Sequence, residues 1–340
     1  MAAALRPMGS MNVLADRHHA GLFHSLQLLA KRLGWALYTP TGHAWWDEGV
    51  WSFGRDWYGD DRLARQFLTQ TGPDMEYPDW PINYVTLEEA QNMDWAYVIA
   101  TLQDNQLGFG LFARRMGAQL IFQVGNTGQQ INWALDPIVL NSSEMPLLGR
   151  GITYHQEFDS DGIFGYVPPS PSKDIRSLMH NFWDTSCFAL WQQIDLPEYE
   201  LTHYGHQPPE GPAQVGYGGN LKPQTAVAAA MADSAWGWHD KPQGDGFGHI
   251  LHGWAAIGRP LIGHASHYLG KMGGVFWQDG ETCIDLDRHS IEETAEIIRG
   301  MSRQRHREMC ENIRAVFDAN VDYDREEQAI RELLRVPVPA

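Results

Sequence analysis

Short apolar runs alternate with helical periodicity along the first half of the chain. Residues 11–15 form an apolar run typical of a buried strand, and apolar residues then recur with helical spacing from Leu22 to Leu33. Residues 35–38 resume as a strand. The same alternation returns as a strand at 97–102, a helix at 109–116 and strands at 119–124 and 136–140. Strands and helices in this order predict a doubly wound α/β domain with a parallel sheet.

The second half predicts another domain of the same class. Its expected elements are a helix through Leu190, a strand at 199–204, a small-residue helix at 225–234, a helix from Gly248, strands at 261–262 and 283–286, and a helix capped by Ser290. Acidic residues follow Ser290 in the first turn, as the helix dipole favours. The second half is therefore also α/β.

The length of the chain and a proline-rich segment near its middle suggest two domains. The 340 residues exceed one ordinary domain, and the Pro-rich segment 168–172 is the best candidate linker. We expect a first domain at 1–170 with a Trp-rich insertion at about 45–89, and a second domain at 171–318. Residues 317–323 are interpreted as a linker, and 319–340 should contain a final helix that returns to the first domain.

Charge and composition narrow the partners. The formal net charge of −17 disfavours nucleic acid, whose binding needs rows of Lys and Arg. The three cysteines are far apart, and neither a signal peptide nor an uninterrupted apolar stretch of membrane-spanning length is evident. A soluble cytoplasmic protein with no membrane partner is expected.

One glycine-rich segment carries most of the candidate chemistry. Gly246 and Gly248 flank Phe247 just before an expected helix. Glycines allow a ligand to approach the backbone, and the free amides of a helix start can hold a diphosphate. The helix then ends in a Gly-Arg-Pro turn that leads into a strand.

Three blocks in this region resemble the donor-binding half of the GT-B glycosyltransferases. Asp-Gly-Phe-Gly at 245–248, Gly-Trp-Ala-Ala-Ile-Gly-Arg-Pro at 253–260 and Asp-Gly-Glu-Thr at 279–282 are similar to the blocks of the retaining, glycogen-synthase-like members, also known as glycosyl transferase group 1. The resemblance covers residues 236–300. It implies two Rossmann-like domains that face each other across a cleft, and a C-terminal helix that crosses back to the first.

The resemblance also implies site residues. Asp245 stands where the family has an acid that contacts the donor sugar; a plain helix N-cap is the competing interpretation. Gly246, Phe247, Gly248 and His249 would line the donor site. The second acid of the family, which grips the ribose, falls on Gly253; His249 or His252 is an alternative carrier of that contact. A UDP-sugar is the favoured donor. Whether transfer retains or inverts the anomeric centre stays open.

A metal-independent transferase needs a cation near the leaving diphosphate, because negative charge develops there. Lys241 is the first candidate and Arg259 the second. His264 and Ser266 follow an expected strand and are candidates for phosphate or sugar contacts. A solvated surface lysine is the competing interpretation for Lys241.

The loop after the first strand is a second candidate region. It contains His18, His19 and Gly21. In inverting members of the superfamily this loop supplies the base that deprotonates the acceptor, a task that suits imidazole near neutral pH. We take His19 as the candidate base and His18 and Gly21 as candidate substrate contacts; a structural histidine is the alternative.

Metal sites and cofactors are not expected. His264 and His267 are three residues apart with no acid nearby in the sequence. His203 and His206 have glutamates around them, but their position makes a metal site a weak interpretation. The nucleotide sugar would therefore be the sole co-substrate.

The function expected from these features is transfer of a sugar from a nucleotide donor to an acceptor hydroxyl. The acceptor is open between a protein, a glycan and a small molecule, with modified DNA less favoured. Alternatives are a non-catalytic nucleotide or sugar binder and a nucleotide-sugar epimerase of the same fold. A dehydrogenase is disfavoured, because no Gly-x-Gly-x-x-Gly follows the first strand.

Overall fold

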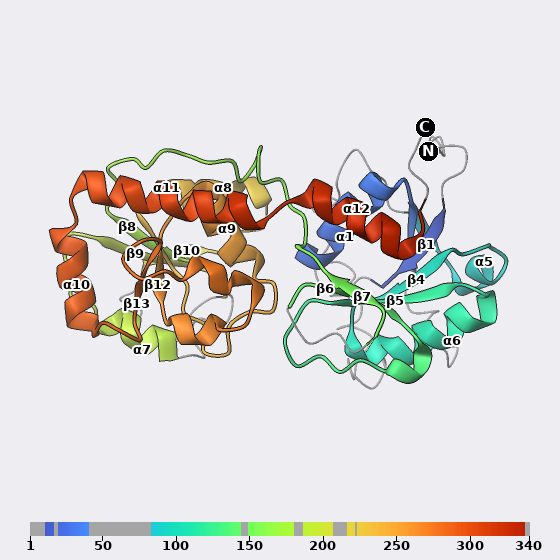
Figure 1. Cartoon of the computed structure of the whole chain (residues 1–340). Coiled ribbons are helices and arrows are strands. Elements are labelled where there is room, and N and C mark those ends of the chain that lie inside the picture. Colours follow the sequence, from blue (N-terminus) through green and yellow to red (C-terminus); the bar gives the residue numbers. More distant parts are fainter. Residues whose placement is uncertain are drawn as a thin grey trace. The chain divides into compact units, whose positions relative to one another are not determined.

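The computed structural model describes residues 11–16, 20–40, 83–143, 149–179, 186–206, 216–221 and 223–336. The chain divides into two compact units (Figure 1). The first comprises Met1–Phe158 with Tyr323–Ala340, and the second comprises Asp159–Asp322. The boundary that the sequence suggests at residue 170 thus falls inside the second unit, together with the Pro-rich segment. None of the helices in the described ranges has the length and apolarity needed to cross a membrane.

The first unit is built on a seven-stranded sheet in the order β3-β2-β1-β4-β5-β6-β7. All its neighbouring strands are parallel. The strands are β1 (Asn12–Ala15), β2 (Ala36–Pro40), β3 (Asn83–Val85), β4 (Tyr97–Ala100), β5 (Gln119–Val124), β6 (Ile138–Asn141) and β7 (Gly151–Thr153). The order reverses at β1, which is the hallmark of a Rossmann-like sheet.

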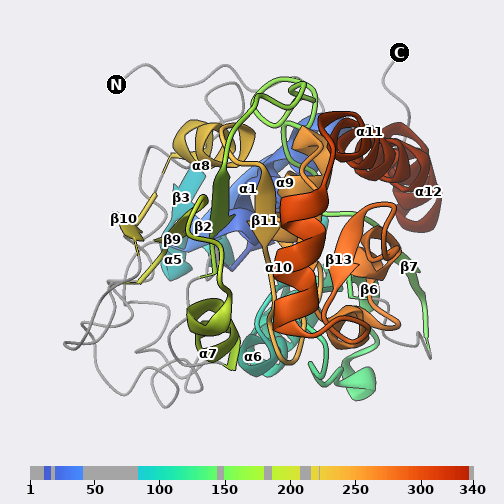
Figure 2. The same ribbon diagram turned by 90° about the vertical axis from the view of Figure 1, so that its left-hand side faces the viewer.

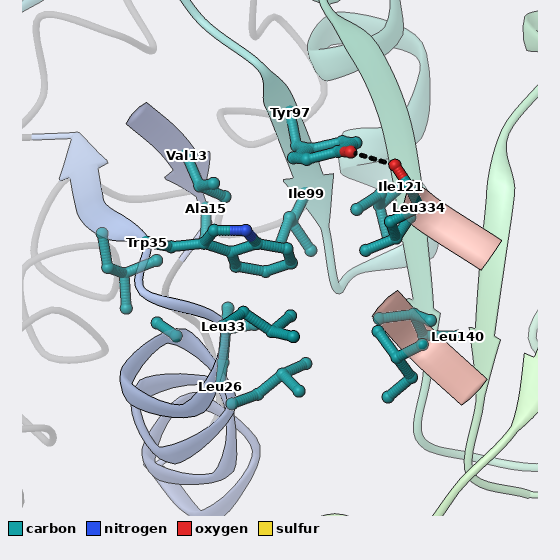
Figure 3. Packing of buried hydrophobic residues seen from close by; sticks show 14 of the residues in the cluster. Val13, Ala15, Leu26, Leu33, Trp35, Tyr97, Ile99, Ile121, Leu140 and Leu334 are labelled. Carbon is teal, nitrogen blue, oxygen red and sulfur yellow. Dashed lines mark hydrogen bonds between the residues drawn. The ribbon is translucent and has the colours of Figure 1, made fainter. Parts of the chain in front are cut away.

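Helices cover both faces of this sheet because its strands are apolar on both sides. They are α1 (Ala20–Leu33), α5 (Leu87–Gln91), α6 (Gln106–Met116) and α12 (Tyr323–Leu334), with short 3-10 turns at Gln103–Asn105 and Trp133–Leu135. Val13 and Ala15 join the core under α1 and α12, whereas Leu14 joins the core under α6. Figure 3 shows the first core, where the Tyr97 hydroxyl donates to the Leu334 carbonyl over 2.7 Å.

Ion pairs fasten α12 to the rest of the first unit. The Arg32 guanidinium at the end of α1 lies 2.6 Å from both Glu157 and Asp324. His155 Nδ1 lies 2.5 Å from Glu326 Oε1. The last helix is therefore held by the first helix and by the segment that leaves β7.

The second unit contains a six-stranded parallel sheet in the order β10-β9-β8-β11-β12-β13. Its strands are β8 (Asp174–Ser177), β9 (Glu200–Tyr204), β10 (Gly216–Gly219), β11 (Trp236–Trp238), β12 (Leu261–Gly263) and β13 (Cys283–Asp285). The order reverses at β8, so this sheet is doubly wound as well.

Among its described residues, the second unit has five helices that flank the sheet, which Figures 1 and 2 show from two sides. They are α7 (Ser186–Gln193), α8 (Gln224–Ala232), α9 (His249–Ile257), α10 (Ile291–Gly300) and α11 (Arg303–Asn320), with 3-10 turns at Ala265–Tyr268 and Met272–Phe276. Trp236 and Trp238 belong to the core that includes residues of α7 and α10. Between them, the Cα of Gly237 faces the ring of Trp254 on α9, and an added Cβ would lie only 2.7 Å from that ring. Glycine at 237 therefore lets α9 pack closely against β11.

The structure confirms the α/β fold class with two Rossmann-like sheets and corrects several details. Residues 317–320 continue α11 and are not part of a linker. Residues 83–89, placed in the expected insertion, include β3 and the start of α5. Residues 41–82, with most of the Trp-rich segment, lie outside the described ranges.

Candidate functional site

Acidic residues and histidines gather at the carboxyl ends of three neighbouring strands of the second unit. Asp240 comes two residues after β11, His264 directly follows β12, and Asp285 ends β13. The register places these ends side by side, because Trp238 pairs with Ile262 and Gly263 pairs with Asp285. Ligands of doubly wound sheets bind beyond this edge.

Asp240 is fully buried and faces two imidazoles. Its Oδ1 accepts hydrogen bonds from the backbone N–H of His264 over 3.0 Å and from its Nδ1 over 2.8 Å. Nδ1 of His267 lies 3.1 Å from the same oxygen. Burial opposes ionisation of Asp240, but the contacts with these histidines outweigh it and hold its pKa below the usual value. The hydrogen bond to Asp240 raises the pKa of His264.

This finding corrects the expectation that no acid accompanies His264 and His267. Within the described residues, Asp240, His264 and His267 are the group whose ligand atoms lie close enough together to hold a metal ion, all within 4.8 Å of one another. The acid comes from the neighbouring strand, so no local motif reveals it. Sequence reasoning missed Asp240 for that reason.

Carboxylates from the end of β13 fix the turn that carries the histidines. The backbone N–H of Ala265 donates to Asp285 over 3.0 Å. Ser266 donates to Asp287 twice, from its N–H over 2.7 Å and from its hydroxyl over 2.9 Å. The Ser266 hydroxyl, a candidate phosphate or sugar contact, is thus hydrogen-bonded to Asp287. Ser266 is nevertheless exposed to solvent.

Asp245 lies at the centre of a second cluster, in the glycine-rich turn. His239 Nε2 donates to its Oδ2 over 2.9 Å, and the Lys241 ammonium donates to its Oδ1. Burial opposes its ionisation, but the hydrogen bond and charge of His239, followed by the charge of Lys241, lower its pKa far below the usual value. Asp245 is therefore a fixed carboxylate beside a cation whose side chain is 44% exposed.

The glycine turn leads into α9 as the sequence predicts. Gly244 and Gly248 adopt positive φ angles of 60° and 76°, which L side chains rarely tolerate. Gly248, His249 and Ile250 are half-buried, so the start of α9 retains solvent access. Gly246 and Phe247 are buried, and the Phe247 ring stacks on His252 at 4.0 Å. Phe247 thus packs on the interior side of the turn. The amides in the first turn of α9 are the groups available to an anion.

Lys271 is a cation of this region that the sequence did not indicate. Its ammonium donates to the Gln243 carbonyl in the turn. A Cβ added at Gly244 would meet the Lys271 Nζ at 2.5 Å. Burial and the charge of Lys241 both act to lower the pKa of Lys271, with burial the larger cause. The turn is therefore flanked by two lysines.

Arg259 lies away from this turn. Its burial and its hydrogen bonds to backbone carbonyls correct the expectation that it contacts phosphate. This arginine lies two residues after the end of α9, is fully buried, and donates to backbone carbonyls. Its acceptors are Ser234 at 2.9 Å, Val167 at 2.7 Å, Ala232 at 2.6 Å and Gly258 at 3.1 Å. A guanidinium used in this way joins chain segments, and its full burial keeps it from a ligand in solvent.

Gly253 is also turned inward. A Cβ there would meet the Met231 side chain at 3.2 Å and Phe164 at 3.3 Å. Gly253 offers no side chain for a ribose contact, and a larger residue there would require these neighbours to shift. His252 is buried, and its Nδ1 donates to the Gly248 carbonyl over 3.0 Å. Of the two alternative carriers, His249 is the one with solvent access.

In the first unit, Asp16 fixes the start of the loop after β1. The buried carboxylate accepts hydrogen bonds from the backbone of Thr101 at 2.9 Å and of Leu102 at 3.2 Å, and from Asn105 Nδ2 at 2.9 Å. Burial nevertheless raises the pKa of Asp16. Gly21 lies in the first turn of α1. His18 and His19 lie outside the described residues, so their proposed roles stay predictions.

No family model matches the sequence, and no curated protein matches it either. Solved structures do resemble the fold. HepE from Anabaena, in a structure with UDP, aligns with a TM-score of 0.65 at 12% identity over 96% of this chain and 99% of that chain. Sucrose-phosphate synthase from Thermosynechococcus elongatus gives 0.63 at 12% identity over 96% and 98%. OtsA, a trehalose-6-phosphate synthase, gives 0.61 at 10% identity over 97% and 100%.

The chain has the GT-B fold. The second unit contains the blocks that resemble the donor-binding half of GT-B enzymes. Its helix α9 begins directly after the glycine-rich turn. The glycine turn, Lys241 and Asp245 all lie in this one unit. These candidate groups therefore belong to a single compact unit.

Proposed function

We propose that this protein transfers a glycosyl group from a UDP-sugar to the hydroxyl of an acceptor. The observation that carries the proposal is the solvent-accessible start of α9, introduced by Gly248 and flanked by Lys241. A helix start binds anions through free N–H groups and its dipole. A GT-B fold and a glycine turn resembling the donor half of retaining members support the same assignment, as does HepE, whose structures contain UDP and UDP-glucose.

The proposed chemistry uses groups of the protein in place of a divalent ion. As the bond from the sugar to the diphosphate breaks, negative charge grows on the leaving oxygen, and preorganised donors stabilise it. The first-turn amides of α9 and the ammonium groups of Lys241 and Lys271 would supply these donors. Asp245, ionised and held by His239, would accept hydrogen bonds from the donor sugar.

The acceptor stays unassigned in this proposal. His19, in the loop after β1, would deprotonate the acceptor hydroxyl if the reaction inverts the anomeric centre. Asp16 ties the start of that loop to the beginning of the segment after β4, and so limits where the loop can begin. We place the activity in the cytoplasm, which the sparse cysteines support.

A non-catalytic nucleotide or sugar binder is the second candidate function. It is favoured by Gly253, where the family has an acid and where an added Cβ would lie 3.2 Å from Met231 and 3.3 Å from Phe164. Such a protein would bind the donor through the same turn without turnover. Binding and turnover measured on the same preparation separate the two functions.

The test is incubation of the full chain with UDP-, GDP- and ADP-sugars, followed by measurement of free nucleotide and of melting temperature. The transferase predicts slow release of UDP from at least one UDP-sugar together with a raised melting temperature. A raised melting temperature without release identifies a binder. No shift with any nucleotide sugar at millimolar concentration contradicts both functions.

A further inference from the structure

Three potential metal ligands converge at the ends of β11 and β12. Oδ1 of the buried Asp240 lies 2.8 Å from Nδ1 of His264 and 3.1 Å from Nδ1 of His267. The two rings are 4.9 Å apart, and their side chains are 24% and 22% exposed. The carboxylate thus forms the floor of the cluster, and the imidazoles form a rim that solvent can reach.

We propose that Asp240, His264 and His267 bind a divalent transition-metal ion of the zinc class. Metal–ligand distances near 2.1 Å around a tetrahedral ion separate the ligand atoms by about 3.3 Å. The observed 2.8 and 3.1 Å would therefore open by only a few tenths of an ångström. Two imidazoles and one carboxylate suit zinc, cobalt or iron rather than magnesium or calcium. The partly exposed imidazoles give an ion a route to the cluster from solvent.

The hydrogen bonds around His267 favour a metal over a plain ion pair. Its Nδ1 is buried, and in the described part of the chain it has no hydrogen-bond partner, although Asp240 Oδ1 is 3.1 Å away. The carboxylate oxygen already accepts from the N–H and the ring of His264. An ion bound between the three atoms would satisfy the buried nitrogen at the same time.

The surrounding contacts hold the ligands in place before an ion arrives. Asp285 and Asp287 anchor the backbone of Ala265 and Ser266, the two residues that follow His264. Such support for a ligand-bearing turn is a regular feature of metal sites. The ion would tie the turn at 264–267 to the end of β11. It has no part in the proposed transfer step, and its binding can be measured without a donor.

The test is calorimetric titration of the full, chelator-treated chain with zinc, and with magnesium as a second ion. Cobalt provides a spectroscopic check, because its visible bands are intense when it is four-coordinate. We expect one zinc ion per chain, bound at least 100-fold more tightly than magnesium. His267→Ala should weaken zinc binding at least ten-fold while leaving the far-UV circular dichroism spectrum unchanged.

His289→Ala is the matched control. This half-buried histidine contacts the carboxylate of Asp279 at 3.0 Å and so shares the local chemistry, but among the described residues it belongs to no group able to hold a metal ion. Its removal should leave zinc affinity unchanged. Equal losses in both variants, or zinc affinity in the wild type no higher than in His267→Ala, would overturn the proposal. A further outcome is that pyrophosphate, and not zinc, stabilises the chelator-treated chain and loses this effect in His264→Ala. That result would identify an anion site and would also overturn the metal proposal.

Discussion

Nδ1 of His264 lies 2.8 Å from Oδ1 of Asp240, although 24 positions separate the two residues in the sequence. The contact exists because β11 and β12 are parallel neighbours, and their carboxyl ends meet at one edge of the sheet. The intervening residues contain the glycine turn and α9. The topology therefore places an acidic floor, a histidine turn and a helix start in one region of the second unit.

Lys241→Ala should impair donor use without unfolding the chain. The ammonium is a candidate partner for the leaving diphosphate, and its side chain is 44% exposed, so little packing is lost. We expect kcat/KM for UDP release to fall roughly 10- to 100-fold. The melting temperature should fall by no more than a few degrees, because the Lys241 side chain is partly exposed and His239 still donates to Asp245.

Lys173→Ala is the control for this measurement. Lys173 is an exposed lysine that directly precedes β8. It therefore lies at the amino ends of the parallel strands, whereas the candidate site lies at their carboxyl ends. Its removal should leave UDP release unchanged. Equal turnover in wild type, Lys241→Ala and Lys271→Ala would remove the two lysines from the proposed donor chemistry.

Arg259→Met should destabilise the chain and leave donor binding by the folded fraction intact. The substitution removes a buried guanidinium that donates to four backbone carbonyls and leaves those carbonyls without this donor. We expect a loss of about 3–5 kcal/mol in the free energy of unfolding, measured with urea. Arg288→Ala, at a side chain that is 69% exposed, should change it by no more than about 0.5 kcal/mol. A stable Arg259→Met variant that fails to bind UDP would instead restore Arg259 to the ligand site.

The ion pairs of Asp245 should give stability a dependence on acid. Its pKa is lowered in the folded chain, so its ionised form stabilises the fold above the unfolded pKa, near 3.9, and this contribution is lost as pH falls toward the folded pKa. We expect Asp245→Asn to be less stable than the wild type at pH 6, with the gap narrowing by pH 3. The control is Asp195→Asn, at an 85% exposed side chain, which should show a small gap at both values. A gap for Asp245→Asn that stays constant from pH 6 to pH 3 would contradict this account of its pKa.

Local pattern was enough to predict many of the elements but not the site. β5 spans 119–124 as its apolar run suggests, and Ser290 caps α10 through a capping box with Glu293. β10 and β11 were missed, because Gly-Tyr-Gly-Gly and Trp-Gly-Trp are short and rich in glycine. Pairing with neighbours decides such strands.

The glycine turn could be located from the sequence because its signal is local. Asp240 and Lys271 could not, since they reach the site through the sheet register and through a turn that folds back on Gln243. Arg259 was misjudged for the converse reason. The sequence does not distinguish an arginine that donates to backbone carbonyls from one that binds a phosphate.

Hydrogen exchange of the full chain with and without UDP tests the central claim most directly, because it reports on the backbone amides themselves. If the start of α9 holds the diphosphate, UDP should slow exchange in peptides covering residues 246–251, and Lys241→Ala should weaken that protection. Peptides covering β5 in the first unit should exchange at the same rate in both conditions. Binding of UDP with no protection at 246–251 would contradict the account.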